Sequence, residues 1–244
     1  MIPYAMSHKI SILSTMPIAQ SLIDGAAEQG ALVDALSFIK VSAVTGEKIE
    51  NEIVDLCHLH VTVVFTSANA VKAVDDIVLH ADPEWEIYCI GNGTLDAVKR
   101  CFRSSVVRGT AKDAASLAAL IIDHGADEVV LFCGDKRLDT LPVALREEDI
   151  PVYEVVVYTT TGISQKLKRA YDGILFFSPS AVSSFFSANK VSETTVFFAI
   201  GTTTADAIKK HTRNKVIVSE TASKETVLNY AVQYFQKQAQ PDNL

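Results

Sequence analysis

The chain carries the same pair of strand-to-helix turns twice, about 110 residues apart, and this repeat limits what it can fold into. The segment 63–71 (VVFTSANAV) matches 174–182 (ILFFSPSAV), and 88–98 (YCIGNGTLDAV) matches 198–208 (FAIGTTTADAI). Matches in the same order at nearly one offset indicate an internal duplication. The 244 residues suffice for two domains of about 100–150 residues each. The duplication therefore predicts two similar halves with a cleft between them.

Continuous apolar runs alternate with amphipathic segments along the chain. Strands are predicted at 9–13, 61–65, 87–90, 129–132, 174–177, 196–200 and 216–218, and helices at 69–80, 94–102, 114–124 and 203–211. Apolar runs without alternation are typical of parallel strands covered on both faces. The predicted fold class is therefore α/β, with two similar doubly wound parallel-sheet domains. The duplication alone leaves open whether each domain is contiguous, and two extended stretches, 36–43 and 153–161, are placed to link the halves.

Composition excludes several classes of protein. The net charge is −7 and the pI is near 5.4, whereas a general nucleic-acid binder needs a basic face. No run approaches the ~20 apolar residues of a membrane helix, and the first residues lack the features of a secretory signal. Four cysteines without a CxxC pair indicate buried free thiols in a reducing compartment. We expect a cytoplasmic protein that binds neither nucleic acid nor membrane.

Polar residues follow four of the predicted strands, where ligands bind in open parallel sheets. The candidates for substrate binding are Ser67, Asn69, Thr94, Ser178, Ser180, Thr203 and Thr204. One interpretation is that these residues only cap the helices that follow, with Pro179 as a first helical residue after Ser178. The other is that four helix N-termini with free N–H groups form a site for anionic groups.

Other chemistry-bearing residues stand outside these turns. Tyr158 ends an apolar run, where it either packs in the core or presents a phenol that stays protonated at neutral pH and can donate a proton. Lys136 and Arg137 follow a strand and are candidates for carboxylate contacts, although a solvated loop is an equal alternative. His58 and His60 share a strand face, but nothing completes a metal site. Complete signatures for dinucleotide binding, a P-loop or a serine-hydrolase elbow are absent from the sequence.

Taken together, these residues resemble the uroporphyrinogen-III synthase (HemD) family over nearly the whole chain. Each motif is short, but the motifs run in the family's order. They are Phe65-Thr66-Ser67 with Asn69-Ala70-Val71, the turn 91–94, Gly134 followed by Leu141-Pro142-x-Ala144-Leu145, Val157-Tyr158-Thr159, the segment 176–180 and the segment 199–205. One departure concerns Arg137. The family often has arginine four residues after this glycine, where the chain has Leu138.

The resemblance implies a domain organisation and a reaction. It implies one discontinuous domain, 1–37 with 162–244, a second domain, 42–154, and linker strands at 38–41 and 155–161. It implies a lyase that closes hydroxymethylbilane to uroporphyrinogen III with loss of water and inversion of the last pyrrole ring. Tyr158 matches the family tyrosine proposed to assist departure of the hydroxyl. The family needs no metal and no organic cofactor.

Expectations about partners and alternatives follow. We expect a monomer in tetrapyrrole and heme biosynthesis that has a small-molecule substrate and a transient contact with hydroxymethylbilane synthase. The alternative is a cytoplasmic two-domain protein that binds a small ligand or regulates, with the same fold and no catalysis. A donor residue at Tyr158 favours the enzyme.

Overall fold

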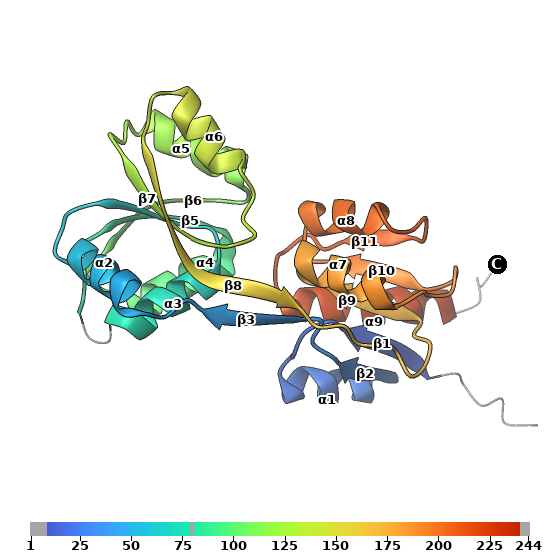
Figure 1. Cartoon of the computed structure of the whole chain (residues 1–244). Helices are drawn as coiled ribbons and strands as arrows, with labels where there is room; N and C mark the ends of the chain where they lie inside the picture. Colours follow the sequence, from blue (N-terminus) through green and yellow to red (C-terminus); the bar gives the residue numbers. More distant parts are fainter. Residues whose placement is uncertain (1–8, 79–80, 240–244) are drawn as a thin grey trace, which may run out of the picture. The chain divides into compact units, whose positions relative to one another are not determined.

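The computed structural model describes residues 9–78 and 81–239, and the chain divides into two compact units (Figure 1). Unit 1 comprises residues 1–40 and 161–244, and unit 2 comprises residues 41–160. The chain therefore passes from one unit to the other within two strands, β3 (Ile39–Ala43) and β8 (Val152–Gly162).

Unit 2 has a six-stranded sheet with helices on both faces (Figure 1). The strand order is β3-β8-β7-β4-β5-β6, where the further strands are β4 (Thr62–Phe65), β5 (Glu86–Ile90), β6 (Val106–Ala111) and β7 (Val129–Gly134). The helices are α2 (Glu47–Cys57), α3 (Ala68–Val78), α4 (Gly91–Cys101), α5 (Ala114–Asp123) and α6 (Thr140–Glu147). All neighbouring pairs from β8 to β6 are parallel.

The edge strand β3 departs from the parallel pattern. The Val44 N–H donates to the Val157 carbonyl, and the Thr159 hydroxyl contacts the Ser42 carbonyl. Residue numbers rise on one strand as they fall on the other, so β3 lies antiparallel to β8.

Strand alternation sends neighbouring side chains of unit 2 into two separate cores. Val63 and Phe65 pack with the helices α2, α3 and α4, whereas Val64 between them packs with α5 and α6. All six residues of the central strand β7 are buried. A strand that is covered on both faces must be apolar at every position, and this explains the unbroken apolar runs of the sequence.

Unit 1 repeats this arrangement with a five-stranded parallel sheet. Its order is β11-β10-β9-β1-β2, formed by β1 (Ile10–Ser14), β2 (Ala31–Ala35), β9 (Gly173–Phe176), β10 (Val196–Ala199) and β11 (Val216–Val218). The helices α7 (Pro179–Ala188) and α8 (Thr202–Lys209) cover one face, and α1 (Gln20–Glu28) and α9 (Lys224–Ala239) cover the other. Reading from β2 gives β2-β1-β9-β10-β11, which corresponds strand for strand to β8-β7-β4-β5-β6 of unit 2. The duplication seen in the sequence is therefore a duplication of topology.

The predicted α/β class with parallel sheets is confirmed, and the seven predicted strands correspond to β1, β4, β5, β7, β9, β10 and β11. The predicted helix 69–80 corresponds to α3, and its last two residues lie outside the described part of the chain. The strands β2 and β6 were not predicted. Both lie at a sheet edge, where one side of the strand is open to solvent, and a charged residue interrupts the apolar residues of each, Asp34 in β2 and Arg108 in β6.

Candidate active site

The carboxyl edge of the unit 2 sheet brings Ser67 and Tyr158 together. Ser67 lies between the end of β4 and the start of α3, and Tyr158 pairs with Gly134, the last residue of the neighbouring strand β7. The Ser67 side chain lies close enough to the Tyr158 phenol to lower its pKa. In parallel sheets this edge is where ligands bind.

The Tyr158 ring packs directly against Gly134. A Cβ at residue 134 would overlap the ring and lie 2.8 Å from the Tyr158 Oη. Only a residue without a side chain leaves the ring this position, so the glycine is required by close approach. Asp135 holds the backbone that follows the Tyr158 side chain. The Asp135 N–H donates to the Tyr158 carbonyl over 3.1 Å, and the Thr160 N–H donates to Asp135 Oδ1 over 2.8 Å.

Burial is the main influence on the Tyr158 phenol. It raises the pKa of Tyr158 above the ordinary value of ~10, and the nearby Ser67 side chain opposes this with a smaller lowering. The charge of Asp135 adds a small further rise in this pKa. The phenol is therefore fully protonated at neutral pH and available as a proton donor.

A pocket of about 230 Å³ opens beside Tyr158 within unit 2. Its walls come from β3, α3 and β8, and its lining residues are Val41, Ala43, Asn69, Lys72, Ala73, Asp76 and Tyr158. Asn69 was a predicted substrate-binding residue, and its side chain is exposed next to this space. The structure thus places two predicted site residues, Asn69 and Tyr158, on one pocket.

Sequence reasoning missed Lys72 and Asp76. Both follow Asn69 on α3 at spacings of three and seven residues, which places them on one helix face. The helical periodicity of the segment was recognised, and counting one and two turns on from Asn69 would have found them.

Arg137 is held by carboxylates. Its guanidinium forms ion pairs with Asp139 and Glu154, and Glu154 also pairs with Arg146 over 2.6 Å. The Asp139 hydrogen bond is the largest cause that raises the pKa of Arg137. The neighbouring Leu138 is exposed. Contact between Arg137 and substrate stays a prediction, and such a contact would have to compete with these two carboxylates.

Two of the predicted hydroxyls occupy equivalent buried positions in the two units. Thr94 is 6% exposed in the first turn of α4, and Thr204 is 3% exposed in the first turn of α8. The interpretation of these residues as helix caps was wrong, because the N-cap positions belong to Ile90 and Gly201. The helix α4 begins directly after β5, and two residues separate β10 from α8, so both threonines fall inside a helix.

Unit 1 presents the corresponding polar turns at its own carboxyl edge. Ser178 caps α7, since its Oγ accepts a hydrogen bond of 3.2 Å from the Ala181 N–H, and Pro179 is the first helical residue as predicted. Ser180 is partly exposed in the first turn of α7, and Thr203 is exposed in the first turn of α8. Their part in substrate binding stays a prediction.

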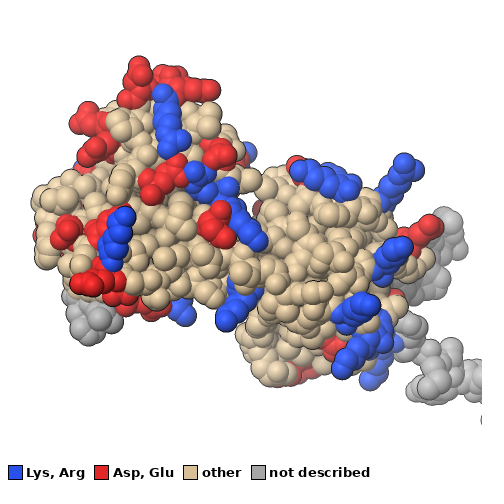
Figure 2. Space-filling model, viewed as in Figure 1, with Lys and Arg blue, Asp and Glu red and all other residues tan. Residues whose placement is uncertain are grey.

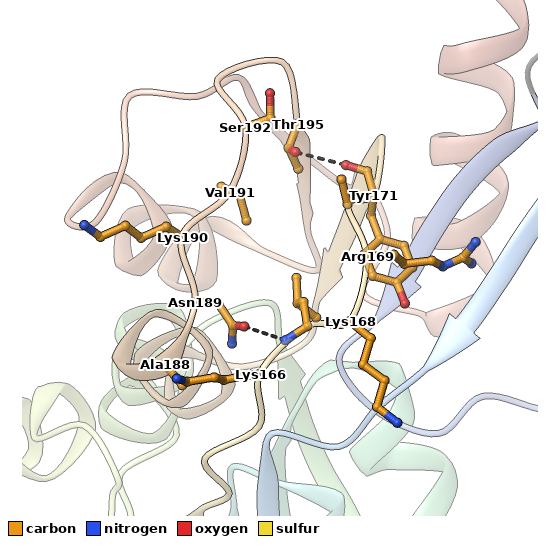
Figure 3. A pocket seen from close by; sticks show the side chains of 12 residues that line it. Lys166, Lys168, Arg169, Tyr171, Ala188, Asn189, Lys190, Val191, Ser192 and Thr195 are labelled. Carbon is orange, nitrogen blue, oxygen red and sulfur yellow. Dashed lines mark hydrogen bonds between the residues drawn. The ribbon is translucent and has the colours of Figure 1, made fainter.

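A second pocket, of about 370 Å³, lies at the opposite, amino edge of the unit 1 sheet (Figure 3). It is formed by the segments that precede β9 and β10, and these are joined by a hydrogen bond of 2.8 Å from the Leu167 N–H to Asn189 Oδ1. Figure 3 shows Lys168 and Lys190 extending in opposite directions from this pocket. None of the predicted site residues lines it. Its basic side chains do not converge on a common point.

Metal-binding and membrane-spanning features are both missing from the described part of the chain. Residues 9–78 and 81–239 contain no group of three or more His, Cys, Asp or Glu side chains placed to hold a metal ion. Over the same ranges, each helix is either too short or too polar to cross a membrane.

Comparisons with known proteins agree with this fold. Residues 20–229 match the family model described as uroporphyrinogen-III synthase HemD. A mutant uroporphyrinogen III synthase from Thermus thermophilus is 13% identical with a TM-score of 0.64, covering 93% of this chain and 99% of that one. The uroporphyrinogen-III synthetase of Helicobacter pylori is 16% identical with a TM-score of 0.60, covering 92% and 99%. At these identities the structures establish the fold, and the family match covers most of the sequence. The chain belongs to the uroporphyrinogen-III synthase HemD family.

Proposed function

We propose that this protein is a lyase that closes linear hydroxymethylbilane to uroporphyrinogen III, with loss of water and inversion of the last pyrrole ring. The observation that carries the proposal is the Tyr158 phenol, which is protonated and lies against Gly134 and near Ser67 at the carboxyl edge of the sheet. Family membership supports the enzyme over a ligand-binding or regulatory protein without catalysis.

In the proposed first step, Tyr158 protonates the departing hydroxyl of the substrate. The carbon–oxygen bond breaks with its electron pair on oxygen, the phenol proton completes a water molecule, and a phenolate remains. The positive charge left on the substrate is shared between the methylene carbon and the ring nitrogen. Attack by the other terminal ring and loss of a proton restore the phenol. The sequence is redox-neutral, so the proposal needs no electron-transfer cofactor.

The rest of the proposed task is conformational. Hydroxymethylbilane also closes without an enzyme, to the uninverted isomer, so the protein must favour one closure over another. The turns that bear Ser67, Thr94, Ser178, Ser180, Thr203 and Thr204 begin helices at the carboxyl edges of the two sheets. Free N–H groups and the positive ends of helix dipoles are suited to carboxylates there.

The decisive experiment is an isomer assay. Hydroxymethylbilane is generated in situ from porphobilinogen by its synthase, the protein is added, and the oxidised products are separated. We expect isomer III, and a product that contains only isomer I, as in the enzyme-free blank, would end the proposal.

The role of Tyr158 is tested with Tyr158→Phe in the same assay. General acid catalysis typically contributes 10²–10⁴-fold, so we expect kcat to fall by about 10²-fold. The matched control is Tyr153→Phe, because Tyr153 is an exposed residue of the same strand whose hydroxyl donates to Glu52. Equal turnover in the two variants would remove Tyr158 from the mechanism.

The contact with hydroxymethylbilane synthase is a further part of the proposal. Its support is the instability of the substrate, which favours direct transfer. A stable analogue of hydroxymethylbilane, added to a coupled reaction of the two enzymes, competes with substrate that enters from solution and so distinguishes the two routes. Direct transfer predicts that the analogue does not slow isomer III formation. Full inhibition by the analogue would indicate that hydroxymethylbilane is released into solution first.

A further inference from the structure

The pocket beside Tyr158 contains a cation and a carboxylate that the proposed mechanism does not use. Lys72 and Asp76 lie one turn apart on α3, and both side chains are exposed to the pocket. Within the part of the chain that the structure describes, neither takes part in an ion pair or a hydrogen bond. Their charges are therefore available to a ligand that enters the space next to the phenol.

The size of the pocket limits its occupant. Sites that enclose a drug-sized ligand usually measure about 300–1,000 Å³. A volume of about 230 Å³ is too small for a linear tetrapyrrole, but it suits a single pyrrole ring with its side chains. The remaining walls, Val41, Ala43 and Ala73, offer apolar surface to the faces of such a ring.

The polar groups of the pocket complement a pyrrole that carries carboxylate side chains. An ammonium attracts a carboxylate, a carboxylate accepts the ring N–H, and a phenol reaches a hydroxyl on the adjoining carbon. Lys72, Asp76 and Tyr158 supply one group each.

We infer that this pocket binds the terminal pyrrole ring that bears the hydroxymethyl group, with Lys72 on a side-chain carboxylate of that ring and Asp76 on its N–H. The inference rests on the proposed function and identifies which ring of the substrate the Tyr158 site receives. Tyr158 fixes the choice, because its proton must reach the hydroxymethyl oxygen. Asp76 has a second effect, since a carboxylate at the ring nitrogen stabilises the positive charge that develops as water leaves.

Lys72→Met and Asp76→Asn remove each charge and keep the shape of the side chain. In the isomer assay, Lys72→Met should raise KM by about tenfold with kcat little changed, because its contact is the same before and during reaction. Asp76→Asn should lower kcat by about tenfold or more, because its contact strengthens as charge develops. Lys72→Arg should restore the KM.

Matched controls come from α2 of the same unit. Lys48→Met and Asp55→Asn change the same residue types at exposed positions away from this pocket, and both should retain the kinetics of the unaltered protein. If Lys72→Met and Asp76→Asn behave like these controls, the inference is overturned while isomer III formation by the unaltered protein still supports the enzyme. If the unaltered protein forms no isomer III, the proposed function fails first.

Binding of a single ring gives a readout that does not depend on turnover. Porphobilinogen is a monopyrrole with two carboxylate side chains, and we expect it to shift NMR signals of α3 and of Tyr158. The affinity should fall by about tenfold in Lys72→Met and should remain in Lys48→Met. Equal affinity in these two variants, or shifts confined to another part of the protein, would refute the assignment. Circular dichroism of each variant confirms that it is folded.

Discussion

At the scale of single residues, the position of Tyr158 depends on the absence of a side chain at Gly134. A methyl group there would overlap the phenol ring, because the position of a Cβ lies within 2.8 Å of the Tyr158 Oη. Gly134→Ala should therefore displace the ring and lower kcat by about as much as Tyr158→Phe. Gly25→Ala is the control, since a Cβ at this α1 position meets nothing within 4 Å. Isomer assays and thermal unfolding of both variants check this, and full activity of Gly134→Ala would show that the close fit is not required.

Burial also decides the reactivity of the thiols. Desolvation raises the pKa of Cys89 and of Cys133 to about 11. At pH 8 only about one such thiol in a thousand is ionised, against roughly a quarter at the ordinary pKa of ~8.5. We expect both to react with an aromatic disulfide reagent about 100-fold more slowly in the folded protein than in urea. Mass spectrometry of the labelled protein identifies the modified sites, and rapid labelling of either residue in the folded protein would contradict the prediction.

At the scale of elements, the helix α5 begins with a side-chain cap that the helices α4 and α8 do not have. Asp113 accepts a hydrogen bond of 2.8 Å from the Ser116 N–H, whereas the N-cap positions of α4 and α8 form no side-chain cap bond. Without a side-chain cap, the first backbone N–H groups of α4 and α8 have no partner within the helix, and an anion site requires such groups.

Asp113→Ala should lower the free energy of unfolding by about 0.5–1 kcal/mol, in the lower part of the range for lost caps because the carboxylate is exposed. The hydrogen bond from Ser116 lowers the pKa of Asp113 below its ordinary ~3.9. The stabilisation is therefore present above about pH 4 and is lost as the pH falls through the lowered pKa.

Urea unfolding at pH 7 and at low pH measures both effects. The control is Asp123→Ala at the other end of the same helix, where a carboxylate gains nothing from the dipole. An equal loss in the two variants at pH 7 would show that the cap contributes nothing.

At the scale of the whole molecule, charge is divided unequally between the two units. Residues 41–160 carry ten Lys and Arg against twenty Asp and Glu, a net charge of −10, and the rest of the chain has a net charge of +3. Figure 2 shows acidic side chains gathered over α5 and α6 of unit 2. The proposed substrate, which has eight carboxylates, would therefore be repelled by the average field of unit 2, and any attraction there must come from local groups such as Lys72.

The continuity of unit 2 leads to a prediction about folding. Both of its apolar cores are formed only by residues between 41 and 160. A fragment of residues 41–160 should therefore fold by itself and unfold in urea in one cooperative transition, with a slope of about 1–3 kcal/mol per molar. A fragment of residues 1–120 interrupts that core and should not fold. A gradual, non-cooperative transition of the fragment 41–160 would contradict this view of the unit.

Much of the fold and part of the site could be predicted from the sequence. The central strands were found because burial on both faces leaves an unbroken apolar run, as in β4 and β7. The edge strands β2 and β6 were missed because Asp34 and Arg108 interrupt their apolar residues. Tyr158 was found through its place at the end of an apolar run and through family resemblance. Lys72 and Asp76 were missed because a charged residue on an amphipathic helix is normally a solvated one.

The sequence by itself determined the duplication, the α/β class and the phenol. Each depends on a local pattern: the duplication on repeated turns, the α/β class on apolar periodicity, and the phenol on a residue type. The tertiary structure alone decided which residues of separate elements meet. Gly134 and Tyr158 are 24 positions apart in the sequence, yet the Tyr158 ring packs against Gly134 because β7 and β8 are neighbours in the sheet. The packing of each unit likewise buries Thr94 and Thr204 in the first turns of their helices, and in unit 2 it places Lys72 and Asp76 on the pocket of Tyr158. Sequence order carries no record of such distances, because the registers of strands and the faces of helices are fixed only when the sheet forms.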